Sequence, residues 1–552
     1  RREWKSADGS LVISYNGELY NYRELRSELA EYPFKSETDT EVILASYARW
    51  GTECLQRFNG IFAFALWDVQ KKELILARDP MGVKPLYYSA RGGVVYFSSE
   101  IKALLETGIA RTLDREAFSR FMRITDVIGP QTLFTEVKKL LPGQYALIKD
   151  GSMTLVPYWK MDIGRTEWQS AETWHERIRT TLDAAVSRQL VSDRPVGVFL
   201  SGGIDSSAVL ASVVRAKGSA RTYTTRFEVT SAEDEVKFNR DATLARKTAS
   251  HFGAEHTEIL VRRRDVIGLF EDSAWHLDEP SGSATAVSQL AIARETVRAV
   301  AVVLGGDGGD ELFGGYERYR LSRIMDLYQK LPRTPRAFAE QYPMFRKLNT
   351  HPGASRLALF HFTKQEHLNK VLQEPYRDDP GLGFYSERFF SNPGLPFLEA
   401  LMDADRQFLT DGSLLRTDKL SMAAGLEARV PLLDLEMLAL AARIPADQKV
   451  SIRSTKELFK DAVRDRLPEY LFNEPKRGWF SHASLWLEQE DFHAYAREVL
   501  SPTYYQPTAA LFDWKGIGSL LEEHYSRTGS HRALIWTLLS FQLWARCFKA
   551  VL

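Results

Sequence analysis

Cysteine is nearly absent from this sequence of 552 residues, which holds only Cys54 and Cys547, far apart in the chain. Two cysteines cannot build a disulfide framework or a cysteine-rich zinc site, so we expect a reducing compartment and predict a cytoplasmic protein. Runs of 18 or more apolar residues are also absent. We therefore expect no transmembrane helix and no membrane partner.

An excess of charge of either sign is missing as well. Lys+Arg and Asp+Glu each number 72, so the formal net charge is zero. This balance argues against a general affinity for nucleic acid. The sequence also lacks a GxxxxGK[ST] loop and a GxGxxG run after a predicted strand, which excludes Walker-type and dinucleotide-binding sites.

The chain is too long for one hydrophobic core, and its pattern changes near residues 157–169. Residues 1–160 combine short apolar strands with two segments of helical spacing, which predicts an α+β domain with much antiparallel sheet. The predicted strands are 11–14, 61–67, 73–77 and 94–97, and the predicted helices are 22–29 and 41–49. The pair Asn16-Gly17 is expected to form the turn that ends the first strand.

Residues 170–552 have a different pattern, in which long helices alternate with short apolar strands. This alternation predicts a doubly wound α/β core of parallel strands with helices on both faces. The predicted strands are 196–200, 222–227, 257–260 and 300–304, and the predicted helices are 172–190, 206–214, 241–252 and 285–297. We expect this core at about residues 190–320, followed by a mostly helical part.

The strand at 196–200 is followed by the run SGGIDSS (201–207), which opens the next predicted helix. Glycines let backbone N–H groups approach an anion, and a helix N-terminus favours negative charge. Asp205 would repel a bare phosphate, so we expect a Mg²⁺ ion between them. A plain strand-to-helix turn capped by serine is the alternative, but the complete run after a buried strand favours phosphate binding.

A second glycine-rich loop, GGDGGDELFGGY (305–316), follows the strand at 300–304. Its carboxylates lie at the C-terminal end of a predicted parallel strand, where open α/β sheets bind ligands. Asp310 and Asp205 are predicted to hold one Mg²⁺ from neighbouring strands, and Asp307 to contact the substrate or the incoming amine. A solvated acidic loop is the alternative interpretation.

The first loop resembles that of the N-type ATP pyrophosphatases, and residues 304–316 resemble a segment of asparagine synthetases. The resemblance implies that ATP is a substrate, cleaved to AMP and pyrophosphate as a carboxylate is adenylated. Many members of the family have Ser or Thr in place of Gly305, a difference expected to affect ATP affinity more than the reaction type. The implied contacts to ATP and pyrophosphate are Leu200, Ser201, Gly202, Gly203, Asp205, Ser206, Phe227, Gly305 and Gly306.

The predicted helical part supplies cations. Residues 416–434 and 454–460 resemble asparagine synthetase segments closely. The resemblance assigns Lys456 as the catalytic lysine that holds pyrophosphate and the transition state, with Lys419 and Asp307 as further catalytic residues. Without the resemblance, both lysines would be interpreted as surface charges.

Five segments of the N-terminal region resemble, in order, the class II glutamine amidotransferase domains of the Ntn type. They are YNGELYNY (15–22), ETDTE (37–41), FNGIFAF (58–64), RDPMGVKPLY (78–87) and SSEIK (98–102). The resemblance implies that Asn16 and Gly17 form an oxyanion hole. It also implies that Glu18 and Asp39 bind the α-amino and α-carboxylate ends of glutamine.

That family uses an N-terminal cysteine as its nucleophile, whereas residue 1 here is Arg1 and the family's opening strand is missing. We expect the sequence to be a fragment without the first strands of this α+β sandwich, and its glutaminase half to be inactive. A natural loss of glutaminase, as in β-lactam synthetases, is the alternative. The retained glutamine-binding residues favour the fragment.

The expected activity is a ligase reaction that forms asparagine from aspartate, ATP and glutamine-derived ammonia through a β-aspartyl-AMP intermediate. Because the phosphate loop recognises only ATP, a sugar acid or a peptide is an alternative acceptor, and an intramolecular cyclisation is an alternative reaction.

A non-catalytic relative is disfavoured, since Asp205, Asp310 and Lys456 are all present. A role in tRNA thiolation would need a basic excess and a suitably placed cysteine. The resemblance leaves a homodimer open.

Overall fold

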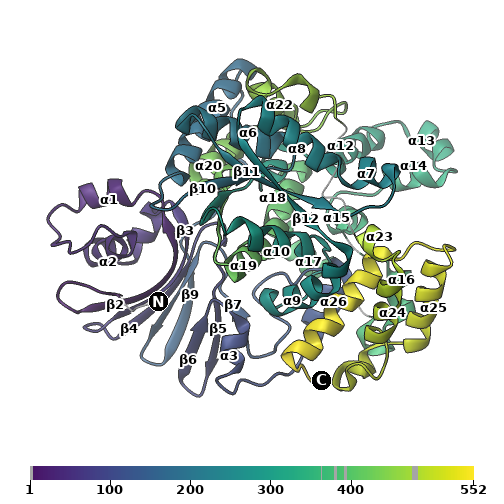
Figure 1. The fold of residues 1–552 in the computed structure, drawn as a ribbon, viewed down its shortest axis with the longest axis horizontal. Helices are drawn as coiled ribbons and strands as arrows, with labels where there is room; N and C mark the ends of the chain where they lie inside the picture. Colours follow the sequence, from purple (N-terminus) through teal and green to yellow (C-terminus); the bar gives the residue numbers. More distant parts are fainter. Residues whose placement is uncertain (1–3, 362, 378–381, 391–393, 475–482) are drawn as a thin grey trace.

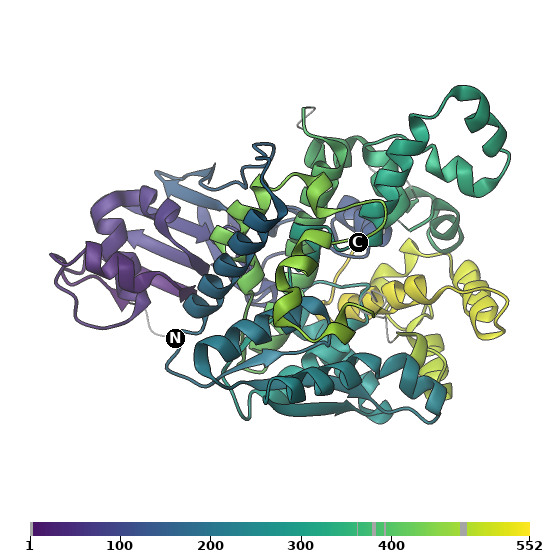
Figure 2. The same ribbon diagram turned by 90° about the horizontal axis from the view of Figure 1, so that it is seen from above.

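The computed structural model describes residues 4–361, 363–377, 382–390, 394–474 and 483–552. Arg1, the first residue of the sequence, lies outside them. Figures 1 and 2 both show a strand-rich N-terminal region beside a larger region built around one parallel sheet. None of the helices in the described part of the chain combines the length and apolar character that a membrane crossing requires.

The N-terminal region is a sandwich of two antiparallel sheets, with strand orders β1-β2-β3-β4-β8-β9 and β6-β5-β7. The central strand β3 is buried on both faces: Phe62 and Phe64 pack toward α2, while Ala63 and Ala65 pack toward the second sheet. This confirms the predicted α+β sandwich. Its strands are β1 (Trp4–Lys5), β2 (Leu11–Leu19), β3 (Gly60–Asp68), β4 (Glu73–Arg78), β5 (Tyr87–Arg91), β6 (Val94–Ser98), β7 (Lys138–Lys139), β8 (Gln144–Lys149) and β9 (Ser152–Pro157), and its helices are α1 (Tyr22–Glu28), α2 (Asp39–Trp50), α3 (Ile101–Leu105) and α4 (Arg115–Ile124).

The predicted turn at Asn16-Gly17 is wrong, because strand β2 continues through this pair to Leu19. Gly17 lies opposite Phe62 in the antiparallel ladder with β3. A Cβ atom at Gly17 would lie 2.1 Å from the carbonyl oxygen of Ile61. The glycine is therefore needed for the close approach of a neighbouring strand rather than for a change of chain direction.

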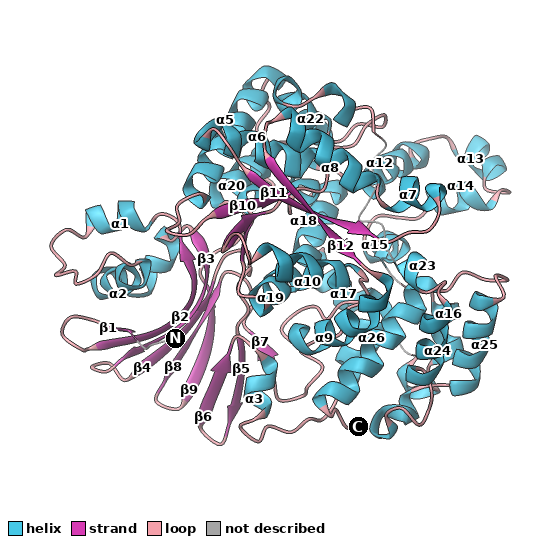
Figure 3. Ribbon diagram, viewed as in Figure 1, coloured by secondary structure: helices cyan, strands magenta, loops and turns pink. Residues whose placement is uncertain are grey.

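The second region contains a parallel sheet with strand order β12-β11-β10-β13-β14. Helices α6 and α8 cover one face, and α10 and α19 cover the other (Figure 3). The predicted doubly wound α/β core is thus confirmed. Its elements are α5 (Ala171–Gln189), β10 (Val196–Phe199), α6 (Ile204–Lys217), β11 (Arg221–Phe227), α7 (Ala232–Phe238), α8 (Arg240–His251), β12 (Glu255–Val261), α9 (Val266–Leu277), α10 (Thr285–Thr296), β13 (Val302–Leu304), α19 (Leu415–Ala423) and β14 (Glu427–Arg429).

Strand β14 lies in the part of the chain that was predicted to be helical. It has only three residues, Glu-Ala-Arg, and pairs with β13 so that Arg429 lies opposite Leu304. So short a strand with two charged residues has no apolar alternation of its own. It forms because the edge of the sheet offers it a partner, and no local pattern could predict that pairing.

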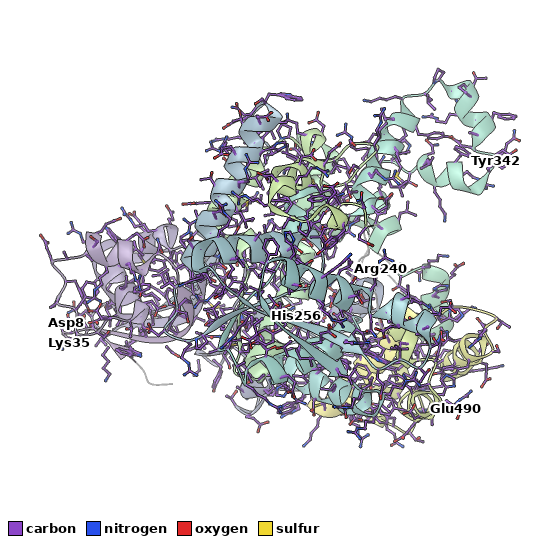
Figure 4. The ribbon with its side chains drawn as sticks, turned by 45° about the horizontal axis from the view of Figure 1, so that its top comes forward. Asp8, Lys35, Arg240, His256, Tyr342 and Glu490 are labelled. Atoms are coloured by element: carbon purple, nitrogen blue, oxygen red, sulfur yellow. The ribbon has the colours of Figure 1, made fainter. Side chains whose placement is uncertain are left out.

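The remaining helices lie between β13 and β14 or after β14. The C-terminal helix α26 packs back on the N-terminal region, with the rings of Phe118 and Phe541 4.7 Å apart. Helices α13 and α14 project from the body, and Figure 4 shows Tyr342 near their far end. The full set of remaining helices is α11 (Gly309–Phe313), α12 (Glu317–Gln329), α13 (Arg333–Ala339), α14 (Pro343–Leu348), α15 (Ala354–His361), α16 (Gln365–Val371), α17 (Leu382–Phe389), α18 (Phe397–Leu409), α20 (Leu435–Arg443), α21 (Ala446–Lys449), α22 (Glu457–Val463), α23 (Ala483–Trp486), α24 (Glu490–Val499), α25 (Trp514–Tyr525) and α26 (Arg532–Phe548).

Candidate active site

The loop after β10 is shaped as a tight strand-to-helix turn. Gly202 has φ +72°, and a Cβ atom there would lie 2.7 Å from the side chain of Leu244, so only glycine fits. The hydroxyl oxygens of Ser201 and Ser206 lie 3.0 Å apart. Helix α6 begins directly after Gly203, so the loop combines hydroxyl donors with a helix N-terminus, a combination suited to phosphate.

The loop after β13 lies against the first loop, because β10 and β13 are paired neighbours in the sheet. A Cβ atom at Gly306 would lie 2.6 Å from the backbone nitrogen of Ser206, and one at Gly309 would lie 2.5 Å from Asp205 Oδ1. These glycines let the two loops touch. The structure therefore brings together the two segments that the sequence predicted to share a ligand.

Lys456 joins the two loops. Its Nζ lies 2.5 Å from Asp205 Oδ1 and 2.9 Å from Asp310 Oδ1. The lysine is buried, whereas the two carboxylates are 22% and 24% exposed. Burial alone would lower the pKa of Lys456, but the charges of Asp205 and Asp310 outweigh burial and raise it. The side chain is therefore a fixed ammonium between two carboxylates.

The backbone of Lys456 is held as firmly as its side chain. The residue has φ +55° and precedes α22. Its N–H donates to the carbonyl of Gly314, 3.0 Å away, at the end of the second loop. A positive φ is unusual for lysine, and such strain is typical of functional positions.

Asp307, the third predicted carboxylate of the site, has a different electrostatic environment. Burial raises the pKa of Asp307, while the charge of Arg416 lowers it and that of Asp205 raises it. Arg416 lies on α19 and donates to Ser281 Oγ, 2.9 Å away. Arg416 belongs to a segment that resembles asparagine synthetases, but no local pattern indicates its role, because its proximity to Asp307 comes from packing.

Three predicted residues contact other parts of the molecule. Lys419 is buried and pairs with Asp278, with its Nζ 4.7 Å from the centre of the Tyr87 ring in the N-terminal region. Phe227 is buried at the end of β11, where Asn239 accepts its backbone N–H. Leu200 is buried and donates its N–H to the carbonyl of Tyr223. Lys419 therefore lies at the junction of the two regions rather than in the Lys456 cluster.

The residues predicted to bind glutamine lie around the end of β2. Asn16 Nδ2 donates to Ser99 Oγ, 3.3 Å away. Asp39, at the start of α2, accepts the hydroxyl of Tyr15 at 2.8 Å and the backbone N–H of Leu19 at 3.0 Å. Burial is the main cause that raises the pKa of Asp39.

Glu18 faces a residue of the other region. Its Oε2 lies 3.6 Å from Nη2 of Arg429, at the end of β14. Burial raises the pKa of Glu18 to about 7, although the charge of Arg429 acts to lower it. Arg429 also pairs with Glu427, 2.7 Å away. No N-terminal motif could have indicated this arginine, because it belongs to strand β14, which was not predicted.

Ion pairs buried at the junction fix how the two regions dock. Three lysines of the N-terminal region reach carboxylates of the second region at 2.7–2.9 Å. These pairs are Lys84–Asp418, Lys102–Asp278 and Lys139–Glu279. Buried charges are tolerated only when they are paired, so these lysines and carboxylates depend on each other across the junction.

Two family models match the chain. The model described as "Glutamine amidotransferase domain" covers residues 4–159, and the model described as "Asparagine synthase" covers residues 177–546, more than half of the chain. The chain belongs to the asparagine synthase family. It is therefore an enzyme of the asparagine synthetase type, an ATP-dependent amidotransferase for which ATP is a substrate.

Similar proteins match this chain over most of its length. "Asparagine synthetase [glutamine-hydrolyzing] 1" of Bacillus subtilis is 30% identical over 97% of this chain and 85% of its own length. A "Putative asparagine synthetase [glutamine-hydrolyzing]" of Mycobacterium bovis is 32% identical over 97% of this chain and 84% of its own length. "Amidase chyE" of Penicillium rubens is 26% identical over 87% of this chain and 78% of its own length.

Proposed function

We propose that this member of the family is a ligase that makes asparagine. The side-chain carboxylate of aspartate attacks the α-phosphorus of ATP, and the bond to pyrophosphate breaks. Ammonia then attacks the acyl carbon of the β-aspartyl-AMP, the bond to AMP breaks, and a proton is released. The observation that carries the ATP chemistry of the proposal is Lys456, held between Asp205 and Asp310 where two glycine-rich loops meet. The choice of aspartate as acceptor is supported by the names of the two bacterial relatives.

In this proposal Lys456 stabilises the pyrophosphate as negative charge develops on it. The ammonium is already placed and already charged, so little reorganisation is needed when ATP reacts. Burial strengthens its electrostatic effect, because water screens it less than a surface lysine. An acyl-adenylate is also easily hydrolysed, so exclusion of water from this site protects the intermediate.

Asp205 and Asp310 are the residues that would hold Mg²⁺. Their carboxylates are hard oxygen donors, converge on one point and remain partly exposed. The described residues contain no group of three or more His, Cys, Asp or Glu side chains suited to a metal ion. Phosphate oxygens and water would therefore complete the coordination shell. Bound Mg²⁺ would neutralise charge on the phosphates.

Glutamine would supply the ammonia in a protein that carries the family's N-terminal cysteine, and free ammonia supplies it in this chain, whose residue 1 is Arg. Asn16 and Gly17 would stabilise an oxyanion, while Glu18 and Asp39 would bind the α-amino and α-carboxylate ends of glutamine. The support is the match to the glutamine amidotransferase model and the names of the two bacterial relatives. The placement of these four residues at one end of β2, with Asp39 held by Leu19, is compatible with a shared ligand.

Another carboxylate is the second candidate for the acceptor. The cluster of Asp205, Asp310 and Lys456 recognises phosphate and does not select the acceptor. The similarity to "Amidase chyE" favours this alternative, because that name specifies no aspartate. Arg416 and Asp307 interact electrostatically with each other and are the groups through which an acceptor with both charges would be bound.

The test is pyrophosphate release from Mg-ATP and ammonium chloride, with and without aspartate, together with detection of asparagine by mass spectrometry. We expect aspartate-dependent pyrophosphate and asparagine in equal amounts, and loss of both in Asp205→Ala. If folded protein binds ATP but aspartate elicits neither product, aspartate is not the acceptor. Sugar acids and acidic peptides would then be assayed for the same pyrophosphate release.

A further inference from the structure

Arg429 touches both proposed sites. Its guanidinium lies 3.6 Å from Glu18 Oε2 on the glutamine side. Its backbone carbonyl accepts the N–H of Gly305, 2.8 Å away, at the first residue of the second loop. A single buried residue therefore bridges the N-terminal strand β2 and the start of a nucleotide loop.

The guanidinium is fixed on its other sides. Nη1 donates to the carbonyls of Gln189 at 2.8 Å and Val191 at 2.6 Å, and Nε donates to Glu427 at 2.7 Å. Nη2 is the nitrogen that faces Glu18. Because a guanidinium is planar and its donors have fixed directions, a change at one nitrogen alters the geometry of the others.

Negative charge surrounds Glu18. The carboxylates of Asp39, Glu427 and Asp193 act on it together, and the charge of Arg429 opposes them. Such a place suits an incoming ammonium group. An α-ammonium that binds Glu18 competes with Arg429 for the same carboxylate, and Arg429 is left with Glu427 and the two carbonyls.

The second loop depends on the same residue. Arg429 lies opposite Leu304 in the parallel pair of β13 and β14, and Gly305 follows Leu304 directly. The next residue, Gly306, packs against the backbone of Ser206 in the first loop. A shift of β14 would therefore be passed to both phosphate loops through backbone contacts.

We propose that Arg429 couples the two sites, so that occupation of Glu18 by the α-ammonium of glutamine changes how β14 holds Gly305 and alters ATP affinity. This inference rests on the proposed function. Arg429 is a positioning residue, since it acts through Glu18 and Gly305. Coupling between two binding equilibria is reciprocal, so ATP must change glutamine affinity by the same factor.

The experiment measures binding, without turnover. Mg-ATP is titrated calorimetrically into the chain in the absence of aspartate and ammonia, with and without saturating glutamine, and the reverse titration is then made. We expect the Kd of ATP to change about fivefold or more, at the lower end of typical coupling. The Kd of glutamine should change by the same factor in the presence of ATP.

Two variants assign this coupling to Arg429. Arg429→Met removes the guanidinium, and Arg429→Lys keeps the charge but cannot contact both carbonyls and Glu18 at once. In each, the coupling factor should approach one while both ligands still bind. Arg188→Met is the matched control, because Arg188 pairs with Asp434 and Glu436 instead. It should keep the wild-type coupling factor.

The outcomes separate the inference from the function on which it rests. Wild-type protein that binds both ligands with independent affinities overturns the coupling and leaves the proposed function intact. Folded protein that binds no glutamine, or no ATP, overturns the corresponding proposed site and the coupling with it. Coupling that persists in a folded Arg429 variant shows that another residue carries it. If Arg429→Met does not fold, Arg429→Lys decides.

Discussion

The proposed nucleotide site and the proposed glutamine site, here called the nucleotide side and the glutamine side, are assembled differently. On the nucleotide side, Asp205, Asp310 and Lys456 all come from one region, and two of them follow directly on neighbouring parallel strands. On the glutamine side, Glu18 belongs to the N-terminal sandwich, whereas its partner Arg429 belongs to the parallel sheet. One site is built within a fold, and the other is completed by docking.

This difference predicts how each side responds to substitution. A side built within one fold should fail when one of its own groups is removed. A side completed by docking should also fail when a distant contact across the junction is broken. Substitutions on the two sides should therefore have different consequences.

Replacing Lys456 with Met should abolish most of the ATP chemistry. The substitution removes the ammonium that bridges Asp205 and Asp310 and leaves both carboxylates facing the phosphates. We expect the rate of pyrophosphate release to fall about 10³-fold, as for other preorganised charges. Glutamine affinity should stay unchanged, because the glutamine side shares no side chain with this cluster.

The control for Lys456→Met is Lys247→Met. Lys247 lies on α8, where its ammonium sits 4.5 Å from the centre of the Tyr470 ring. This variant also loses one lysine of the second region, and its rate should remain within about threefold of wild type, as for a surface change. A rate loss in Lys456→Met no larger than that of the control would contradict the assigned role.

The same contrast explains what could be predicted from the sequence. The two glycine-rich loops could be predicted as phosphate-binding because each combines a buried strand with a glycine-rich turn in consecutive residues. The chain order of strands and helices predicted that both loops lie at one edge of the sheet. Lys456 was assigned only through the family resemblance, since a single lysine in a helical segment carries no pattern. The role of Lys419 was assigned in the same way, and the structure pairs it with Asp278.

The residues that were missed depend on contacts distant in sequence. Strand β14 has no apolar alternation, and Arg429 meets Glu18 only when both regions have folded and docked. Lys84 and Asp418 are 334 positions apart and form a pair that neither segment indicates alone. The turn at Asn16-Gly17 was mispredicted because a glycine needed for close strand packing has the same local sequence as a hairpin turn.

Breaking the Lys84–Asp418 pair should destabilise the protein at the junction. The two side chains are 1% and 3% exposed and 2.7 Å apart. Lys84→Met leaves Asp418 buried without its partner, which should lower the free energy of unfolding by about 3 kcal/mol. Urea unfolding would measure the loss. Glutamine affinity should fall more than ATP affinity, because the glutamine side depends on docking.

A double variant separates the pair from its burial. Lys84→Met combined with Asp418→Leu removes both charges and should recover most of the lost stability, because no unpaired charge remains. If the single and double variants are equally unstable, the loss comes from packing rather than from the unpaired carboxylate. In that case the ion pair does not specify docking.

The smallest expected effect concerns the pH dependence of glutamine binding at Glu18. Burial raises the pKa of Glu18 to about 7, so the folded protein pays to ionise it, and its contribution to stability is lost as pH rises through that value. Only the carboxylate binds an α-ammonium. The Kd of glutamine should therefore rise about tenfold from pH 8 to pH 6, whereas Glu18→Gln should bind weakly with no such slope.

Glu436→Gln, which changes an exposed carboxylate paired with Arg188, should keep the wild-type slope. A wild-type Kd that is equal at pH 6 and pH 8 would show that Glu18 is already ionised before glutamine arrives. Arg429 would then hold Glu18 more tightly than its burial opposes, and the glutamine side would depend even more strongly on docking.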